Sequence, residues 1–196
     1  METENGPVTE ILVHLMRHGI PVQPNLLLGQ RDDAPLPSGT ARCVAAAEGL
    51  AFDRVISSDL SRALIPAARI AAARALPHSV DPRWRELDFG AWTGLAPAEV
   101  EATSHALFWD DPEANAPPEG ERWSQLSTRV GAALTGIDAS TLVLTHGGAM
   151  RAALAALFHM EHRHVWSFDL PYSCVLTLRV WPGEAVPTAQ IVGLTT

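Results

Sequence analysis

The feature that most constrains the fold is an alternation of short apolar runs with alanine-rich stretches along most of the chain. Residues 11–16 form an almost uninterrupted apolar run, as in a strand of a parallel sheet that is covered on both faces. Its polar residue, His14, is expected to be hydrogen-bonded in the core. Further strands are expected at 54–57, 79–81 and 141–144. Strands that alternate with helices predict right-handed crossovers and a parallel sheet between helical layers.

Helices are expected between these strands. Ser38 is placed to cap a helix over 38–49. A second helical pattern covers 59–75, where Pro66 should kink the helix unless the helix starts late. Further helices are expected over 123–137 and 148–158.

The last apolar segments, 174–181 and 189–194, flank a Pro-Gly turn and are expected to pair as an antiparallel edge. The predicted fold class is therefore α/β, a three-layer sandwich with a mostly parallel sheet, helices on both faces and an antiparallel edge. A chain of 196 residues fits one domain over 1–196. Residues 86–122, rich in Gly, Trp, Pro and acidic side chains, are expected to form an insert or lid over one end of the sheet.

Composition excludes several classes of partner. The net charge is -8, and the 14 basic residues form no basic run, so nucleic acid is not an expected partner. Residues 1–10 lack the pattern of a secretory signal. The apolar stretch 148–158 is far shorter than the roughly 20 residues that cross a bilayer. Cys43 and Cys174 are isolated, as is typical of reduced thiols. We expect a cytoplasmic protein with no disulfide and no membrane partner; the oligomeric state is not readable.

Two clusters resemble metal sites, but no metal is expected at either. The first consists of His159, Glu161, His162 and His164. It follows the end of a predicted helix, where cationic side chains suit the helix dipole. The second, Asp110, Asp111 and Glu113, lacks the spacing of an EF-hand.

Reactive side chains directly follow three of the predicted strands. Ligands of open α/β sheets collect outside the carboxyl ends of the strands, so these side chains should meet at one edge. Arginines offer planar donors to phosphate oxygens, and histidines offer a nucleophilic nitrogen or a further donor. Glycines let the backbone approach a ligand. The residues are Arg17, His18 and Gly19, then Ser57, Ser58 and Arg62, then His146 and Gly147. They predict a phosphate pocket.

Four ordered motifs resemble those of the histidine phosphatase superfamily, which includes the cofactor-dependent phosphoglycerate mutases. They are Arg17-His18-Gly19, SSDLSRA around Arg62, RELDFGAWTG around Glu86 and THGG around His146, within residues 11–151. The resemblance implies that His18 is the phosphorylated histidine and Glu86 the proton donor. It also implies that Arg17, Arg62 and His146 bind the phosphoryl group.

The chain departs from the family pattern after the first motif. Family members often continue with Glu-Thr and soon place an Asn, whereas Ile20, Pro21 and Pro24 stand here. Asn25 and Gln30 are the two side chains that could substitute. Pro66 also stands where a Thr is common. Neither departure changes the nucleophile.

The expected chemistry needs no metal and no cofactor. A neutral imidazole can attack phosphorus in line, while Arg17, Arg62 and a protonated His146 neutralise the equatorial oxygens. A lid containing Trp84, Phe89 and Trp92 would raise the pKa of Glu86 and suit it to proton transfer. The nearest rival mechanism uses Ser57 or Ser58 as nucleophile with His146 as base.

Three functions compete. Hydrolysis of a small-molecule phosphomonoester is favoured, mutase-type phosphoryl transfer comes second, and a non-catalytic phosphate-ligand binding protein is third. The stretch 87–121 contains eight acidic residues and no Lys or Arg, a poor receptor for the carboxylated substrate of a mutase. The segment FWDDPEANAPPEGERWSQLSTRV is similar to the α-ribazole phosphatases, and sugar phosphates stay open. Trp109 and Trp123 are expected to pack and border the pocket.

Overall fold

A six-stranded mixed sheet forms the centre of the molecule in the computed structural model, which describes residues 10–182 and 187–196. The strand order is β3-β2-β4-β1-β5-β6, and the first four strands run parallel. β5 pairs antiparallel with β1, and β6 with β5, so the predicted antiparallel edge is confirmed. The bounds are β1 Ile11–Arg17, β2 Arg54–Ser57, β3 His78–Val80, β4 Thr141–Thr145, β5 Val175–Trp181 and β6 Thr188–Thr195.

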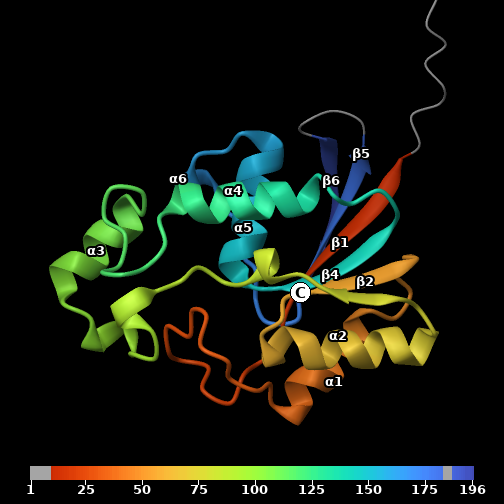
Figure 1. The fold of residues 1–196 in the computed structure, drawn as a ribbon, viewed down its shortest axis with the longest axis horizontal. Helices are drawn as coiled ribbons and strands as arrows, with labels where there is room; N and C mark the ends of the chain where they lie inside the picture. The colour runs from red at the N-terminus through yellow and green to blue at the C-terminus, as the bar shows by residue number, and fades with distance from the viewer. Residues whose placement is uncertain (1–9, 183–186) are drawn as a thin grey trace, which may run out of the picture.

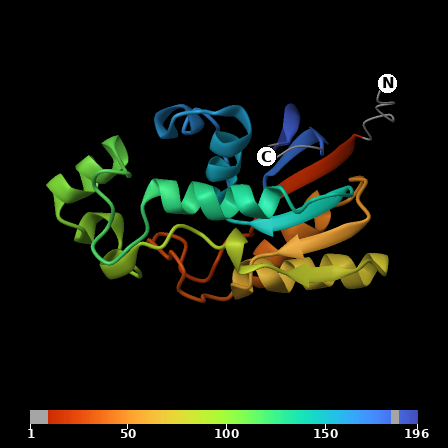
Figure 2. The same cartoon turned by 45° about the horizontal axis from the view of Figure 1, so that its top comes forward.

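Helices cover both faces of this sheet (Figures 1 and 2). On one face lie α1 (Pro37–Ala46) and α2 (Ser61–Arg74), and on the other lie α4 (Trp123–Leu134), α5 (Gly147–Phe158) and α6 (His162–Val165). Alternate side chains of a strand point to opposite faces. Val143 accordingly joins the core cluster under α4 and α5, and Leu142 and Leu144 join the one under α1 and α2. The predicted three-layer α/β sandwich is confirmed.

Two helix starts differ from the prediction. α1 begins at Pro37 without a side-chain cap, and Ser38 lies inside its first turn. Proline suits this position because its missing N–H has no helical partner there. α2 begins at Ser61, two residues later than expected, yet Pro66 still lies inside it. Pro66 cannot donate to the carbonyl of Arg62, so α2 lacks one helical hydrogen bond there.

Other elements agree with expectation. His14 is buried, and its ring nitrogens lie 3.0 Å from Thr177 Oγ1 and 3.0 Å from the carbonyl oxygen of Ala51.

Two of the expectations concern residues that the structure does not describe. They are the absence of a secretory signal in residues 1–9 and the Pro-Gly turn, of which Gly183 lies outside the described residues. Within the described ranges, no helix has the length and hydropathy needed to cross a membrane.

The 86–122 segment projects from one end of the molecule, with α3 (Ala102–Asp110) far from the sheet (Figure 1, left). It also contains the 3₁₀ turns η2 (Gly90–Trp92) and η3 (Pro97–Glu99), and η1 (Pro82–Trp84) precedes it. The segment is built around Phe108, whose ring packs edge-on against Phe89 and Trp92 at 5.9 and 5.6 Å between centroids.

Acidic side chains in this segment bind its own backbone. Glu101 accepts hydrogen bonds from the backbone N–H groups of Thr103 and Ser104, which lower the pKa of Glu101 to about 2. Asp111 likewise accepts from the backbone of Glu113 and Ala114. The acidic composition therefore reflects capping of short helices and turns.

Candidate active site

The residues predicted at the strand ends come together at one edge of the sheet. Arg17 is the last residue of β1, His18 follows it, and Arg62 is the second residue of α2. His146 follows β4 directly and precedes α5. The rings of His18 and His146 lie 5.0 Å apart between centroids. Arg62 and both histidines are almost fully buried.

Hydrogen bonding fixes the proton on the ring of His18. Its Nδ1 lies 2.7 Å from the carbonyl oxygen of Gly19, which can only accept, so we assign the proton to Nδ1. The lone pair then resides on Nε2. Burial, and next the positive charge of Arg62, hold the pKa of His18 well below its ordinary value. His18 is therefore a neutral imidazole near pH 7, the form that can act as a nucleophile.

The glycine after His18 is needed for chain packing. A Cβ on Gly19 would lie 2.1 Å from the carbonyl oxygen of Gly39, so a side chain would block the crossing of the loop over the first turn of α1. The sequence predicts instead that a glycine at this position lets the backbone approach a ligand. Gly147 fits that expectation better, because a Cβ there would lie 3.5 Å from the guanidinium of Arg17 within the pocket.

Backbone carbonyls hold the two arginines in place. Arg17 donates to the carbonyl of Leu170 at 2.6 Å, and its guanidinium lies 4.1 Å from the ring centre of Tyr172. Arg62 donates to the carbonyls of Gly29 and Arg31, each at 2.6 Å. These contacts fix the planar donors before any ligand arrives.

Several buried nitrogens next to His18 have no hydrogen-bond partner within residues 10–182 and 187–196. They are Nε of Arg17, Nε of Arg62 and both ring nitrogens of His146. Leaving a buried donor unsatisfied costs about 1–3 kcal/mol. Donors that converge in this way suit a ligand with several acceptor oxygens, such as a phosphoryl group.

The charge of His146 is set by its buried surroundings. Burial, and next the positive charge of Arg62, hold its pKa well below the ordinary value, so the structure favours a neutral ring. Two arginines and a second histidine already share the same buried space. The prediction of a protonated His146 concerns the phosphoryl-bound state and stays a prediction. A phosphate dianion placed among these groups would favour protonation again.

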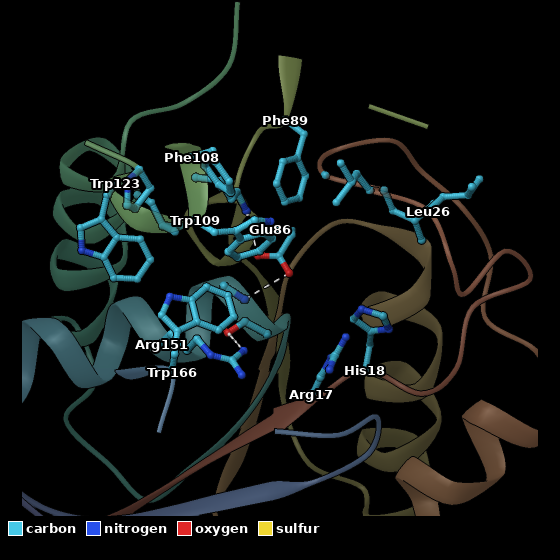
Figure 3. A pocket seen from close by; sticks show the side chains of 18 of the residues that line it. Arg17, His18, Leu26, Glu86, Phe89, Phe108, Trp109, Trp123, Arg151 and Trp166 are labelled. Carbon is cyan, nitrogen blue, oxygen red and sulfur yellow. Dashed lines mark hydrogen bonds between the residues drawn. The ribbon is translucent and has the colours of Figure 1, made fainter. Parts of the chain in front are cut away.

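Glu86 points into the same space from the segment that follows η1 (Figure 3). Its Oε1 accepts from the backbone N–H of Leu87 at 2.9 Å, and its Oε2 from that of Gly148 at 3.2 Å. A Cβ on Gly148 would lie 2.2 Å from Oε1, so a side chain there would displace the carboxylate from this position.

The aromatic surroundings expected for Glu86 are only partly present. Phe89 lines the pocket, whereas Trp84 and Trp92 pack into the hydrophobic core. Of the three aromatic residues expected around the carboxylate, only Phe89 lines the pocket. Trp109 and Trp123, expected to border the pocket, do line it.

The pocket is a cavity of roughly 310 Å³ with two different walls (Figure 3). The polar wall contains Arg17, His18, Arg62, Glu86, Gly147, Gly148 and Arg151. The other wall contains Pro24, Leu26, Leu27, Leu28, Gly29, Leu87, Phe89, Phe108, Trp109, Pro112, Trp123, Leu126, Trp166 and Tyr172.

Comparison with known proteins identifies the family. Residues 13–190 match the model of the histidine phosphatase superfamily (branch 1). The chain belongs to this superfamily. The predicted family, and with it the class of hydrolytic enzyme, is confirmed.

Named relatives of this histidine phosphatase are phosphatases. The glucosyl-3-phosphoglycerate phosphatase of Mycolicibacterium vanbaalenii is 34% identical over 66% of this chain and 65% of its own length. The adenosylcobalamin/alpha-ribazole phosphatase of Escherichia coli is 27% identical over 82% of this chain and 85% of its own. A solved mycobacterial glucosyl-3-phosphoglycerate phosphatase shares the fold, with a TM-score of 0.80, 24% identity and coverage of 94% and 98%.

Three pocket residues of this histidine phosphatase were missed by the sequence analysis: Arg151, Trp166 and Tyr172. Arg151 lies four residues after Gly147 in α5, and this spacing on a predicted helix places both on one face. That signal could have identified it. Trp166 and Tyr172 come from irregular chain around α6 and before β5, where no periodic pattern predicts which way a side chain points.

The serines of the rival mechanism are engaged elsewhere. Ser57 Oγ lies 2.9 Å from Nε2 of His78, and Ser58 Oγ accepts from the backbone of Leu60 at 3.2 Å. Both serines are fully buried and neither lines the pocket. Their surroundings favour His18 as the nucleophile.

Neither of the two candidates for the altered residues after the first motif, Asn25 or Gln30, lines the pocket, and Gln30 makes contacts with the neighbouring chain. Its Nε2 donates to the carbonyl of Glu86 at 3.4 Å, and its Oε1 accepts from Arg85 at 3.2 Å. Asn25 is exposed. Gln30 therefore supports the Glu86 segment.

The described residues contain no group of three potential metal ligands. In the histidine cluster, His162 Nε2 lies 2.7 Å from the carbonyl oxygen of Asp110, a contact that joins α6 to the end of α3. In the acidic cluster, Glu113 accepts from the backbone and hydroxyl of Ser124. Both clusters make structural contacts between elements.

Proposed function

We propose that this protein hydrolyses a small-molecule phosphomonoester through a phosphohistidine intermediate on His18. The observation that supports this most directly is the buried, neutral His18 with its lone pair on Nε2, next to unpartnered nitrogens of Arg17, Arg62 and His146. A phosphoryl group bound by these donors would lie beside the nucleophile.

In the first step, Nε2 of His18 attacks phosphorus and the bond to the ester oxygen breaks. Glu86, as a carboxylic acid, gives its proton to the departing alkoxide. In the second step, the Glu86 carboxylate takes a proton from water, whose oxygen attacks phosphorus while the P–N bond breaks. Inorganic phosphate leaves, and both side chains return to their starting state.

The arginines would neutralise the charge on the equatorial oxygens, which is the main requirement of phosphoryl transfer. Carbonyl contacts already fix both guanidiniums, so little reorganisation is needed when the ester binds. On this basis the reaction needs neither a metal nor a cofactor. The 86–122 segment, which supplies Glu86 and Phe89, would serve as the lid.

For the substrate, α-ribazole 5'-phosphate is our first candidate. It is supported by the relatives named adenosylcobalamin/alpha-ribazole phosphatase, one of which matches over 85% of its length. Mutase-type transfer is less favoured, because stretch 87–121 offers no Lys or Arg to a carboxylated substrate. We infer a cytoplasmic location from the two buried, unpaired thiols Cys43 and Cys174.

Two experiments test this proposal. Phosphate release is measured from α-ribazole 5'-phosphate, glucosyl-3-phosphoglycerate, 3-phosphoglycerate and sugar phosphates, and 3-phosphoglycerate is also checked for isomerisation. Rapid quenching should trap label on His18 through a bond that survives alkali and is lost in acid. Label on a serine would contradict the mechanism. A lack of turnover with every ester would favour a binding protein instead.

A further inference from the structure

The pocket of this protein extends beyond the phosphoryl-binding residues into an aromatic wall that the proposed chemistry does not use. Trp109, at the end of α3, and Trp166, directly after α6, both line the cavity. Their rings meet edge to face with centroids 4.8 Å apart. The two residues are 37% and 40% exposed, whereas Trp84 is fully buried. Large aromatic surface that stays exposed inside a pocket is suited to contact with a ligand.

The aromatic wall offers apolar surface and few polar groups. The indole N–H of Trp109 already donates to Nε2 of His105 at 2.9 Å. Phe108 and Trp123 continue the same wall (Figure 3). A hydroxyl-rich sugar would lose hydrogen bonds to water here without replacing them, and that loss is unfavourable. A flat apolar ring would lose none.

Only one charged side chain of the pocket, that of Arg151, contacts the aromatic wall within the described residues. The charged residues that line the cavity within the described chain are Arg17, Arg62, Glu86 and Arg151. Arg17 and Arg62 bind the phosphoryl group in the proposed function. Arg151 donates to the carbonyls of Gly147 and Phe168 at 3.3 and 3.1 Å. Its remaining surface stacks on Trp166, with 4.1 Å from the guanidinium carbon to the ring centre. Arg151, whose Nε is buried without a hydrogen-bond partner within the described residues, is thus the one cation that a second anionic group on the substrate would meet among apolar side chains.

The aromatic wall adjoins the phosphoryl site through a short series of contacts. A Cβ on Gly147 would lie 3.5 Å from the guanidinium of Arg17 and 3.3 Å from that of Arg151. Arg151 in turn covers one face of Trp166, whose edge contacts Trp109. One ester with its phosphate at Arg17 could thus reach both indoles.

We propose that Trp109 and Trp166 form a leaving-group subsite that selects phosphomonoesters of uncharged, ring-bearing alcohols over those of small or carboxylated alcohols. This inference rests on the proposed function and adds the residues that determine its specificity. Burying the exposed parts of the two indoles against a ring provides the affinity, because apolar area is removed from water on both sides.

The test uses three primary alkyl phosphates whose alkoxide leaving groups are similar in basicity: propyl phosphate, 3-phenylpropyl phosphate and 3-carboxypropyl phosphate. We expect kcat/KM for the phenyl ester to exceed that of the propyl ester by about 10-fold or more, the carboxylate ester being the poorest. Trp166→Ala and Trp109→Ala should each lower the ratio of kcat/KM for the phenyl ester to kcat/KM for the propyl ester to near one. Leu107→Ala is the matched control, since Leu107 is exposed on the same helix but does not line this cavity.

A second measurement does not depend on turnover or on the tryptophan variants. His18→Ala should bind 3-phenylpropyl phosphate more tightly than propyl phosphate in calorimetry, and 3-phenylpropan-1-ol should inhibit the wild-type enzyme competitively. Equal rates or equal affinities for the two esters would overturn the subsite. An equal loss on both esters in the tryptophan variants would overturn it too. Failure of the proposed function looks different: no ester is turned over and no phosphohistidine forms, whatever the binding preference.

Discussion

The phosphoryl end of the pocket and its aromatic end differ in how their side chains are held. At the phosphoryl end, Arg17 ends β1, His18 and His146 directly follow β1 and β4, and backbone carbonyls hold Arg17 and Arg62. At the aromatic end, Trp109 lies near the end of α3 and Trp166 directly follows α6, and the two contact mainly other rings and Arg151. A rigid scaffold suits groups that must be aligned with the reacting phosphorus. An apolar wall tolerates change, so it can set specificity without disturbing the chemistry.

The largest effect of any substitution should come from His18→Ala at the phosphoryl end. Its neighbours offer no other in-line nucleophile, because Ser57 and Ser58 are buried and bonded elsewhere. We expect kcat to fall on the order of 10⁴-fold or more. The exposed His164→Ala is the matched control and should keep full activity. A folded His18→Ala enzyme with substantial turnover would remove the mechanistic difference between the two ends.

Glu86→Gln should come next, with a loss that depends on the leaving group. Alkyl phosphates need a proton on the departing oxygen, so their kcat should fall about 10²-fold or more. Nitrophenyl phosphate, whose leaving group is weakly basic, should lose much less. The exposed Glu119→Gln in the same segment serves as the control. An equal loss on both esters would assign Glu86 to binding.

Arg129 in α4 should produce a smaller effect of the same kind. It donates to the carbonyls of Arg85 and Glu86, each at 2.8 Å, and pairs with Glu121 at 2.7 Å. It thereby fixes the backbone that carries the proton donor and acts as a positioning residue. Arg129→Met should lower kcat on alkyl phosphates by about 10-fold, because small displacements of catalytic groups are costly.

The readout that separates positioning from simple destabilisation is again the leaving group. If Arg129 only stabilised the fold, alkyl and nitrophenyl phosphates would lose activity equally, because less of the enzyme would be active, and KM would not change. Arg163→Met is a suitable control, because Arg163 is largely exposed and pairs only with Glu161. Glu121→Gln, which keeps the shape but weakens the ion pair, should show a milder form of the Arg129 effect.

The two ends also differ in how far sequence could predict them. Motifs at strand ends located the phosphoryl residues, because the fold places all such ends at one edge. The lowered pKa of His146 could not be predicted, since its burial and its neighbouring arginines appear only in three dimensions. Trp166 and Tyr172 were missed because they lie on irregular chain. The predicted start of α1 was wrong because Ser38 resembles a cap, whereas Leu36 is the cap residue and Pro37 is the first residue of the helix.

Buried histidines at the phosphoryl end should make stability depend on pH. The pKa values of His18 and His146 are lowered in the folded protein, so between those values and about 6.5 the unfolded chain binds more protons. Stability is therefore highest above pH 6.5 and declines as pH falls below it. Each histidine contributes at most about 1.4 kcal/mol per pH unit. Urea titrations from pH 7 to 5 measure this, and His146→Asn should reduce the slope whereas His164→Asn should not.

Chelation should have the smallest effect of all. If Arg17, Arg62 and His146 neutralise the phosphoryl oxygens, a divalent ion is not needed for charge, and Glu86 supplies the proton that a metal-bound water would otherwise deliver. Exhaustive treatment with EDTA should leave kcat/KM unchanged on both 3-phenylpropyl and propyl phosphate. A loss that Mg²⁺ or Zn²⁺ restores on both esters would place a metal at the phosphoryl end. A restorable loss confined to the phenyl ester would implicate the aromatic end, near the contact of His162 with α3.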